Sequence, residues 1–219
     1  MRTAVAVVPL RDGRSGKTRL SAVLGAEDRA RLVAALARHV VTTLAEADGV
    51  SRVVVISADV AFARAALVTV RGPVEVVQQP PDRRGLNAAI AFGRDGVADR
   101  PSTRLLVAHA DLPALAPDDV VALLAQPGPV TIAPDRAGTG TNALVLDRAA
   151  AEFTFRFGVG SLAAHLQEAA RRGWTPALVT RTGTAVDLDT PEDWLALPDV
   201  VRARVRDEVP AMANLSAQA

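Results

Sequence analysis

The sequence contains no cysteine, which excludes disulfide bonds, catalysis by a thiolate and zinc sites built from thiolates. It has only three histidines, and His39, His109 and His165 are too scattered in the chain to form a metal-binding motif. It also lacks an excess of charge, because 25 basic and 24 acidic residues leave a formal net charge of +1. This balance argues against a broad basic face that grips nucleic acid, so any effect of charge must be local.

Long apolar runs are missing as well. After Met1, Arg2 and Thr3 the first apolar stretch is too short for a signal peptide and much too short for a membrane span. The sequence therefore predicts a soluble, cytoplasmic protein that binds neither membrane nor nucleic acid, and it does not define an oligomeric state.

The composition is that of one α/β domain. Of the 219 residues 49% are hydrophobic, which is enough for one substantial core. Apolar runs of strand length alternate with longer stretches at helical spacing, and this alternation predicts a mostly parallel sheet covered by helices. We expect the domain to span residues 1–209 and residues 210–219 to form a flexible tail. Phe153, Phe155 and Phe157 alternate as in an edge strand and are predicted to lie in the core.

Three aspartates are the strongest candidates for chemistry. Asp187 and Asp189 lie two residues apart in a segment predicted to be extended, so both carboxylates can face one ion. Asp111 follows the apolar strand predicted for residues 104–108, and ligands of open α/β sheets collect at the carboxyl ends of strands. Magnesium prefers such oxygen ligands and bridges a few carboxylates to substrate phosphates.

A second interpretation of the same aspartates is purely structural. Asp189 would cap the helix that starts with Thr190 and Pro191, and Asp111 would begin a turn before Pro113. For either residue alone we favour this structural interpretation. Because a predicted phosphate-binding loop accompanies all three aspartates, we favour a Mg²⁺ site for the set.

That loop follows the first predicted strand, which spans residues 4–10. It concentrates Arg11, Arg14, Lys17 and Arg19, whose cations and nearby backbone amides suit an anionic ligand such as a triphosphate. The alternative is a solvated basic loop. Gly16-Lys17-Thr18 is not a P-loop, because the motif requires glycine at the position of Arg11.

Three glycine-containing turns could also contact a ligand. Gly85 and Asn87 begin a predicted helix, where backbone amides and the Asn87 side chain would contact a base or ribose, unless this is an ordinary helix start. The turns of residues 138–142 and 158–161 allow close backbone approach, and the second leads into a helix N-terminus that favours an anion.

Six short motifs occur in the order and spacing of a known family. They are Val8-Pro9-Leu10 with Lys17-Thr18-Arg19-Leu20-Ser21, Gly85-Leu86-Asn87, Asp111-Leu112-Pro113, Gly138-Thr139-Gly140-Thr141-Asn142, Phe157-Gly158-x-Gly160-Ser161 and Asp187-x-Asp189-Thr190-Pro191-Glu192-Asp193. The chain thereby resembles, over nearly its whole length, the phosphoenolpyruvate or 2-phospho-L-lactate guanylyltransferases of coenzyme F-420 biosynthesis. One departure is Val159, which stands where the family often has proline.

The resemblance implies a single-domain, Rossmann-like nucleotidyltransferase fold similar to that of the molybdenum-cofactor guanylyltransferases. It implies GTP as the donor of the nucleotidyl group and Mg²⁺ as the cofactor. The implied catalytic residues are Lys17, Asp111, Asp187 and Asp189, and the three aspartates bind the metal. Acceptor contacts are implied for Thr141, Gly158 and Ser161, and nucleotide contacts for Arg11, Arg14, Lys17, Gly85 and Asn87.

The resemblance leaves two acceptors open. The arginine- and alanine-rich composition is typical of a high-GC actinobacterial source, for which the resemblance implies phosphoenolpyruvate instead of 2-phospho-L-lactate. More distant alternatives are a sugar-phosphate nucleotidyltransferase and a nucleotide-binding regulator without turnover. The presence of all three aspartates argues against the regulator, because a binding module gains little from carboxylates crowded around a phosphate.

Overall fold

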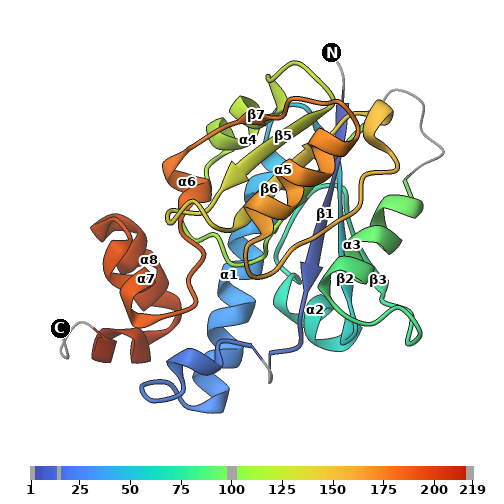
Figure 1. The fold of residues 1–219 in the computed structure, drawn as a ribbon. Helices are drawn as coiled ribbons and strands as arrows, with labels where there is room; N and C mark the ends of the chain where they lie inside the picture. The colour runs from blue at the N-terminus through green and yellow to red at the C-terminus, as the bar shows by residue number, and fades with distance from the viewer. Residues whose placement is uncertain (1–2, 14–15, 98–102, 216–219) are drawn as a thin grey trace.

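The computed structural model describes residues 3–13, 16–97 and 103–215. Within them one sheet of seven strands has the order β3-β2-β1-β4-β6-β5-β7 (Figure 1). The strands are β1 Thr3–Leu10, β2 Val50–Ser57, β3 Val74–Gln78, β4 Thr103–Ala108, β5 Val130–Pro134, β6 Thr141–Leu146 and β7 Ala177–Leu178. Only β6 runs antiparallel to its neighbours in this described sheet, so the predicted mixed, mostly parallel sheet is confirmed.

Helices cover both faces of the sheet, as expected for strands that are apolar on both sides. The α-helices are α1 Ala26–Glu46, α2 Val60–Ala66, α3 Leu86–Asp95, α4 Pro117–Leu124, α5 Ser161–Arg171, α6 Thr182–Ala185, α7 Pro191–Ala196 and α8 Asp199–Glu208. In β1, Ala6 and Val8 pack in the core shared with α1, α2 and α4, whereas Val5 and Val7 pack in the core shared with α3 and α5. The alternation along β1 therefore builds a three-layer molecule (Figure 1).

A third apolar cluster joins the C-terminal helices to the first half of α1. Trp194 of α7 is fully buried there, against Leu32 and Leu36 of α1. The cluster extends into the 3-10 helix η3, Pro210–Leu215, whose Met212 and Leu215 are buried. Residues 210–215 of the predicted tail thus pack on the domain, because they supply apolar side chains that complete this cluster.

The three phenylalanines between β6 and α5 are buried, as predicted, with exposures of 0 to 7%. They lie in a loop and not in a strand, because the backbone of Phe153, Phe155 and Phe157 joins no neighbouring strand. Within the described residues, none of the helices is long and apolar enough to cross a membrane.

Candidate active site

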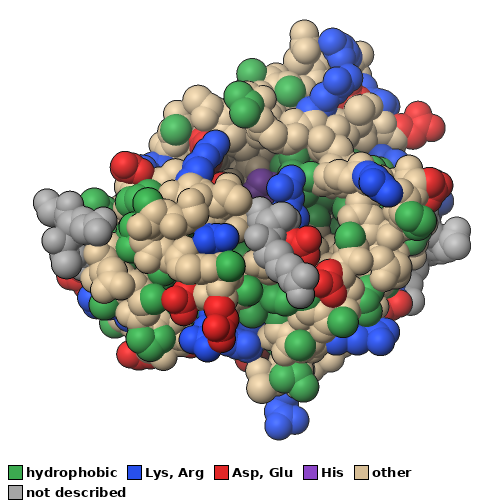
Figure 2. Space-filling view, turned by 90° about the horizontal axis from the view of Figure 1, so that it is seen from below, with side chains coloured by type: hydrophobic (Ala, Val, Ile, Leu, Met, Phe, Trp, Pro, Cys, Tyr) green, Lys and Arg blue, Asp and Glu red, His purple; other side chains and the backbone are tan. Residues whose placement is uncertain are grey.

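The site lies where the sheet's connections diverge. Strand β1 has two parallel neighbours in the sheet, β2 on one side and β4 on the other. The chain runs from β1 to β2 and β3 on the first side and then crosses to β4 on the second. Such a switch point opens a crevice at the carboxyl ends of the strands. A cleft of about 850 Å³ lies there, lined by Lys17 after β1 and Asp111 after β4. Figure 2 looks onto this end of the molecule, where the surface is hollowed between basic and acidic side chains.

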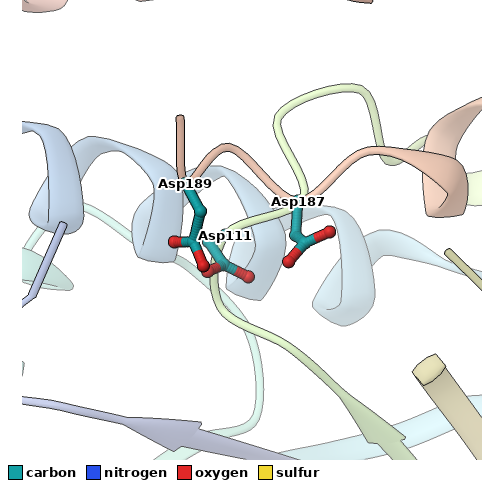
Figure 3. A group of neighbouring side chains, drawn as sticks. All are labelled: Asp111, Asp187 and Asp189. Carbon is teal, nitrogen blue, oxygen red and sulfur yellow. The ribbon is translucent and has the colours of Figure 1, made fainter. Parts of the chain in front are cut away.

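The three predicted aspartates converge in this cleft. One oxygen from each of Asp111, Asp187 and Asp189 lies within 4.8 Å of the other two (Figure 3). The backbone N–H of Leu188 donates to the carbonyl of Asp111 at 3.0 Å, which joins the two segments. Leu188 is fully buried, so the aspartates on either side of it face the cleft together, as the two-residue spacing predicts.

The structural interpretation of Asp189 is wrong. The N-cap of α7 is Thr190, whose hydroxyl accepts a hydrogen bond from the backbone N–H of Asp193 at 3.2 Å. The Asp193 carboxylate accepts the Thr190 N–H in return at 2.9 Å, which completes a capping box. Because Thr190 and Asp193 supply the hydrogen bonds that cap α7, the Asp189 carboxylate is not needed as a cap, and it lines the cleft.

Among the described residues, the Lys17 ammonium neutralises part of this acidic cluster. Lys17 is the only lysine of the chain, and its Nζ lies 2.5 Å from Asp111 Oδ2 and 2.7 Å from Asp189 Oδ1. Its side chain is only 6% exposed. It is also the one non-glycine residue with positive φ, at 56°, in the described part of the chain. A side chain in this left-handed region costs about 1 kcal/mol or more, and functional sites are where such strain is found.

The pKa values in the cluster diverge. Burial alone would lower the pKa of Lys17, but the Asp111 and Asp189 carboxylates raise it above its usual value. Burial alone would raise the pKa of Asp111, but the Lys17 ammonium lowers it. For Asp187, burial and the charge of Asp111 together raise the pKa. The cluster therefore carries an excess of negative charge that Lys17 offsets only partly.

The donor set fits a divalent cation. Carboxylate oxygens are the ligands that Mg²⁺ and related hard cations prefer. Asp111 Oδ1 is buried and has no hydrogen-bond partner within the described residues, although a buried carboxylate oxygen usually has one. A cation in this position would coordinate that oxygen and would also neutralise the excess negative charge.

Two turns form another part of the cleft wall. Thr141 begins β6, and its backbone N–H donates to Ser161 Oγ, at the start of α5, at 2.9 Å. Both residues are nearly fully buried, and both line the cleft with Gly158. Gly158 has φ of 129° and Gly160 has φ of 69°, conformations that only glycine adopts easily. The three residues predicted to contact an acceptor are therefore brought together beside the aspartates.

Comparison with known proteins identifies the family of this chain. Residues 4–198 match the family described as "Guanylyl transferase CofC like". A phosphoenolpyruvate guanylyltransferase of Rubrobacter xylanophilus is 43% identical over 191 residues, which cover 86% of this chain and 90% of that protein. The chain belongs to the CofC-like guanylyl transferase family.

Further relatives agree with this membership. A 3-phospho-D-glycerate guanylyltransferase of Phenylobacterium zucineum is 35% identical over 195 residues, covering 87% of this chain and 87% of that protein. A solved structure of a nucleotidyl transferase from Methanothermobacter thermautotroptrophicus superposes with a TM-score of 0.65 at 17% identity, covering 92% of this chain and 98% of that one. The predicted nucleotidyltransferase fold is confirmed, and this CofC-like protein is a nucleotidyltransferase.

The residues predicted to bind the nucleotide are less closely grouped. Arg11 is exposed and lines the cleft, whereas Arg14 lies outside the described residues. Gly85, with φ of 92°, is the N-cap of α3 and does not line the cleft. The Asn87 side-chain amide forms two hydrogen bonds with the backbone of Phe157: Nδ2 donates to the carbonyl at 3.0 Å, and Oδ1 accepts from the N–H at 2.8 Å. Here Asn87 positions the turn that begins at Gly158.

Two residues of the site had no role assigned to their side chains from the sequence. Asn142 donates to Asp187 Oδ1 at 3.3 Å and to the Thr184 carbonyl at 2.9 Å, so it orients that carboxylate. His109 lines the cleft two residues before Asp111, and its Nε2 is buried without a hydrogen-bond partner in the described structure. Its position directly after the strand predicted for residues 104–108 was a signal in the sequence, but a single histidine does not form a metal-binding motif.

Proposed function

We propose that this CofC-like enzyme transfers GMP from GTP to the phosphate of phosphoenolpyruvate and releases pyrophosphate, as a step in making coenzyme F-420. The observation that supports this most strongly is the meeting of three aspartates and Lys17 at the switch point of the sheet, in the cleft that the turns of Thr141 and Ser161 also line. The 43% identity to a phosphoenolpyruvate guanylyltransferase favours that acceptor.

In the proposed reaction an oxygen of the acceptor phosphate forms a bond to the α-phosphorus of GTP. The bond from the α-phosphorus to the β-phosphate bridging oxygen breaks, and that electron pair leaves with pyrophosphate. No general base is required, because a phosphate dianion is already nucleophilic near neutral pH. The chain therefore has to position two anions and offset their charge.

The proposed roles follow from where the side chains lie. Asp111, Asp187 and Asp189 would hold Mg²⁺, which when bound supplies positive charge against the phosphates. Lys17 and Arg11 would steady the departing pyrophosphate from the first loop, with Arg14 as a further predicted contact.

The acceptor would bind at the part of the cleft wall that Thr141, Gly158 and Ser161 form. The hydroxyls of Thr141 and Ser161 and the backbone of Gly158 would contact it there. Hydroxyl and backbone donors of this kind suit an anionic phosphate or carboxylate group.

A second acceptor is supported by one specific observation. A relative that is 35% identical is a 3-phospho-D-glycerate guanylyltransferase, and its acceptor is also a phosphorylated three-carbon acid. The 2-phospho-L-lactate alternative has no comparable support among the relatives described above. Phosphoenolpyruvate therefore remains the proposed acceptor, with 3-phospho-D-glycerate as the candidate to compare.

The test is release of pyrophosphate by the purified full-length chain with Mg²⁺. Each nucleoside triphosphate is supplied in turn with phosphoenolpyruvate, 3-phospho-D-glycerate and both enantiomers of 2-phospholactate. We expect the highest kcat/KM with GTP and phosphoenolpyruvate. Higher kcat/KM with another acid would replace the acceptor, and no release with any pair would refute the proposed function.

A further inference from the structure

A buried histidine lies directly behind the proposed acceptor wall. His165 is on α5, one helical turn after Ser161, and its side chain is 0% exposed. The backbone N–H of Arg156 donates to its Nε2 at 3.0 Å, and its Nδ1 lies 3.0 Å from Thr141 Oγ1. The imidazole therefore connects the loop before α5 to a hydroxyl of the cleft.

These contacts fix the position of the imidazole proton. A backbone N–H can only donate, so Nε2 must be an acceptor and carries no proton. Burial lowers the pKa of His165 to about 4, so the ring is neutral near pH 7. The single proton of the neutral ring is then on Nδ1, and Nδ1–H donates to Thr141 Oγ1.

The hydroxyl oxygens of Thr141 and Ser161 each accept a hydrogen bond from within the protein. Thr141 Oγ1 accepts from His165, and Ser161 Oγ accepts from the backbone N–H of Thr141 at 2.9 Å. A hydroxyl has one proton to donate, and with an N–H already on its oxygen that proton is directed elsewhere. Both residues line the cleft, so both protons are free to point at a ligand there.

We propose that His165 is a positioning residue that makes the Thr141 hydroxyl a donor toward an unprotonated anionic group of the acceptor. The Ser161 hydroxyl, whose oxygen accepts the Thr141 backbone N–H, is the second donor. The two hydroxyls then form a pair of donors that faces a phosphate or carboxylate. This inference rests on the proposed function, because it assumes that the acceptor binds at this wall. It assigns to His165 a role that reaches the ligand only through Thr141.

A purely structural role for His165 leads to a different expectation. The ring packs against Phe157, with centroids 4.7 Å apart, and against Phe153, with centroids 5.7 Å apart. If packing were its only role, a phenylalanine in its place would leave acceptor binding unchanged. His165→Phe keeps an aromatic ring in this cluster but removes both hydrogen bonds, so it separates the two roles.

The kinetic test uses pyrophosphate release at saturating GTP and Mg²⁺. We expect His165→Phe to raise the KM for the acceptor about tenfold, with kcat and the KM for GTP changed less than about twofold, since the lost contact is made in the ground state and the transition state alike. Thr141→Val, which keeps the shape of threonine without its hydroxyl, should have the same effect. His165→Asn, which returns an amide donor near the place of Nδ1, should restore most of the acceptor affinity.

The double variant shows whether His165 acts through Thr141. If it does, adding His165→Phe to Thr141→Val raises the acceptor KM no further. Multiplied effects, or a His165→Phe variant with an unchanged acceptor KM, would overturn the inference. The matched control is His39→Phe, because His39 is on α1, its Nε2 contacts the Leu115 carbonyl, and it does not line the cleft. Its acceptor KM should equal that of the wild type.

A second measurement needs no variant. Nitrogen NMR of the isotope-labelled wild-type protein near pH 7 should show His165 as the Nδ1–H tautomer. An Nε2–H tautomer or an imidazolium would overturn the inference even if His165→Phe failed to fold. A wild-type protein without turnover refutes the proposed function and this inference together, whereas normal turnover with the other tautomer refutes only this inference.

Discussion

Replacing Lys17 by methionine tests how the acidic cluster is balanced. The Lys17 ammonium lies 2.5 Å and 2.7 Å from oxygens of Asp111 and Asp189, and both residues belong to the proposed magnesium site. A cation that binds these carboxylates must displace the ammonium or remain beside it. Lys17→Met keeps much of the side chain's apolar length and removes the charge, so the variant should bind Mg²⁺ more tightly than the wild type.

The magnitude follows from Coulomb's law. Charges of one and two units about 4 Å apart repel by roughly 2 kcal/mol even at the dielectric constant of water, and by more inside a cleft. If the ammonium moves away instead, it loses charge-assisted hydrogen bonds to two carboxylates, which costs a similar amount. A change of 2 kcal/mol corresponds to about a thirtyfold lower Kd for Mg²⁺.

The assay is calorimetric titration of Mg²⁺ into the protein without nucleotide. Arg64→Met is the matched control, because it removes an exposed cation from α2 and changes the net charge equally. We expect its Kd to match that of the wild type. An unchanged Kd in a Lys17→Met variant with native circular dichroism would show that lysine and metal do not share these carboxylates.

Three further predictions concern activity, packing and pH. Asp187→Asn should lower kcat/KM at least about a hundredfold in the pyrophosphate assay, as expected for a metal ligand. The control Asp118→Asn, on the exposed side of α4, should leave kcat/KM unchanged, and near-normal turnover of Asp187→Asn would remove Asp187 from the site. Gly93→Ala should lower the free energy of unfolding in urea by about 1–3 kcal/mol, because its Cβ would lie 2.6 Å from a valine methyl of β1. Gly96→Ala should be neutral or stabilising, since apart from its chain neighbours the nearest described atom to its Cβ would be 3.6 Å away. Equal effects of the two substitutions would contradict this packing. The pKa of His165 in the folded protein is about 4, below its unfolded value, so the unfolded chain binds more protons and the free energy of unfolding falls from pH 7 to pH 5. In urea titrations this loss should be about 2 kcal/mol smaller for His165→Asn than for the wild type. Equal losses would exclude His165 as the source.

Local patterns predicted most of the fold. The predicted strand of residues 4–10 is β1, Thr3–Leu10, and that of residues 104–108 is β4, Thr103–Ala108, so each begins one residue before its predicted start. The agreement is close because apolar periodicity reports burial directly. Where prediction and structure differ, a distant part of the chain is responsible. Residues 210–215 pack into a cluster around Trp194, and the loop of Phe153 is buried without a strand partner.

The sequence by itself also determined the residues of the acidic cluster. The two-residue spacing of Asp187 and Asp189, and the position of Asp111 after a strand, are local features, and motif order joined them to one family. Spacing shows which side chains face the same way within one segment. It does not show which partner each side chain finds in another segment.

Those partners were decided by the tertiary structure alone. Lys17 meets Asp189 across 172 positions, and Asn87 meets Phe157 across 70. The bond from His165 to Thr141 likewise depends on how α5 packs beside β6. A hydrogen bond depends on distance and direction within tenths of an ångström, which only the packing of the whole domain determines. The sequence therefore selected the three aspartates, and the fold gave them a lysine counter-ion and a cleft wall in which two hydroxyls are hydrogen-bonded.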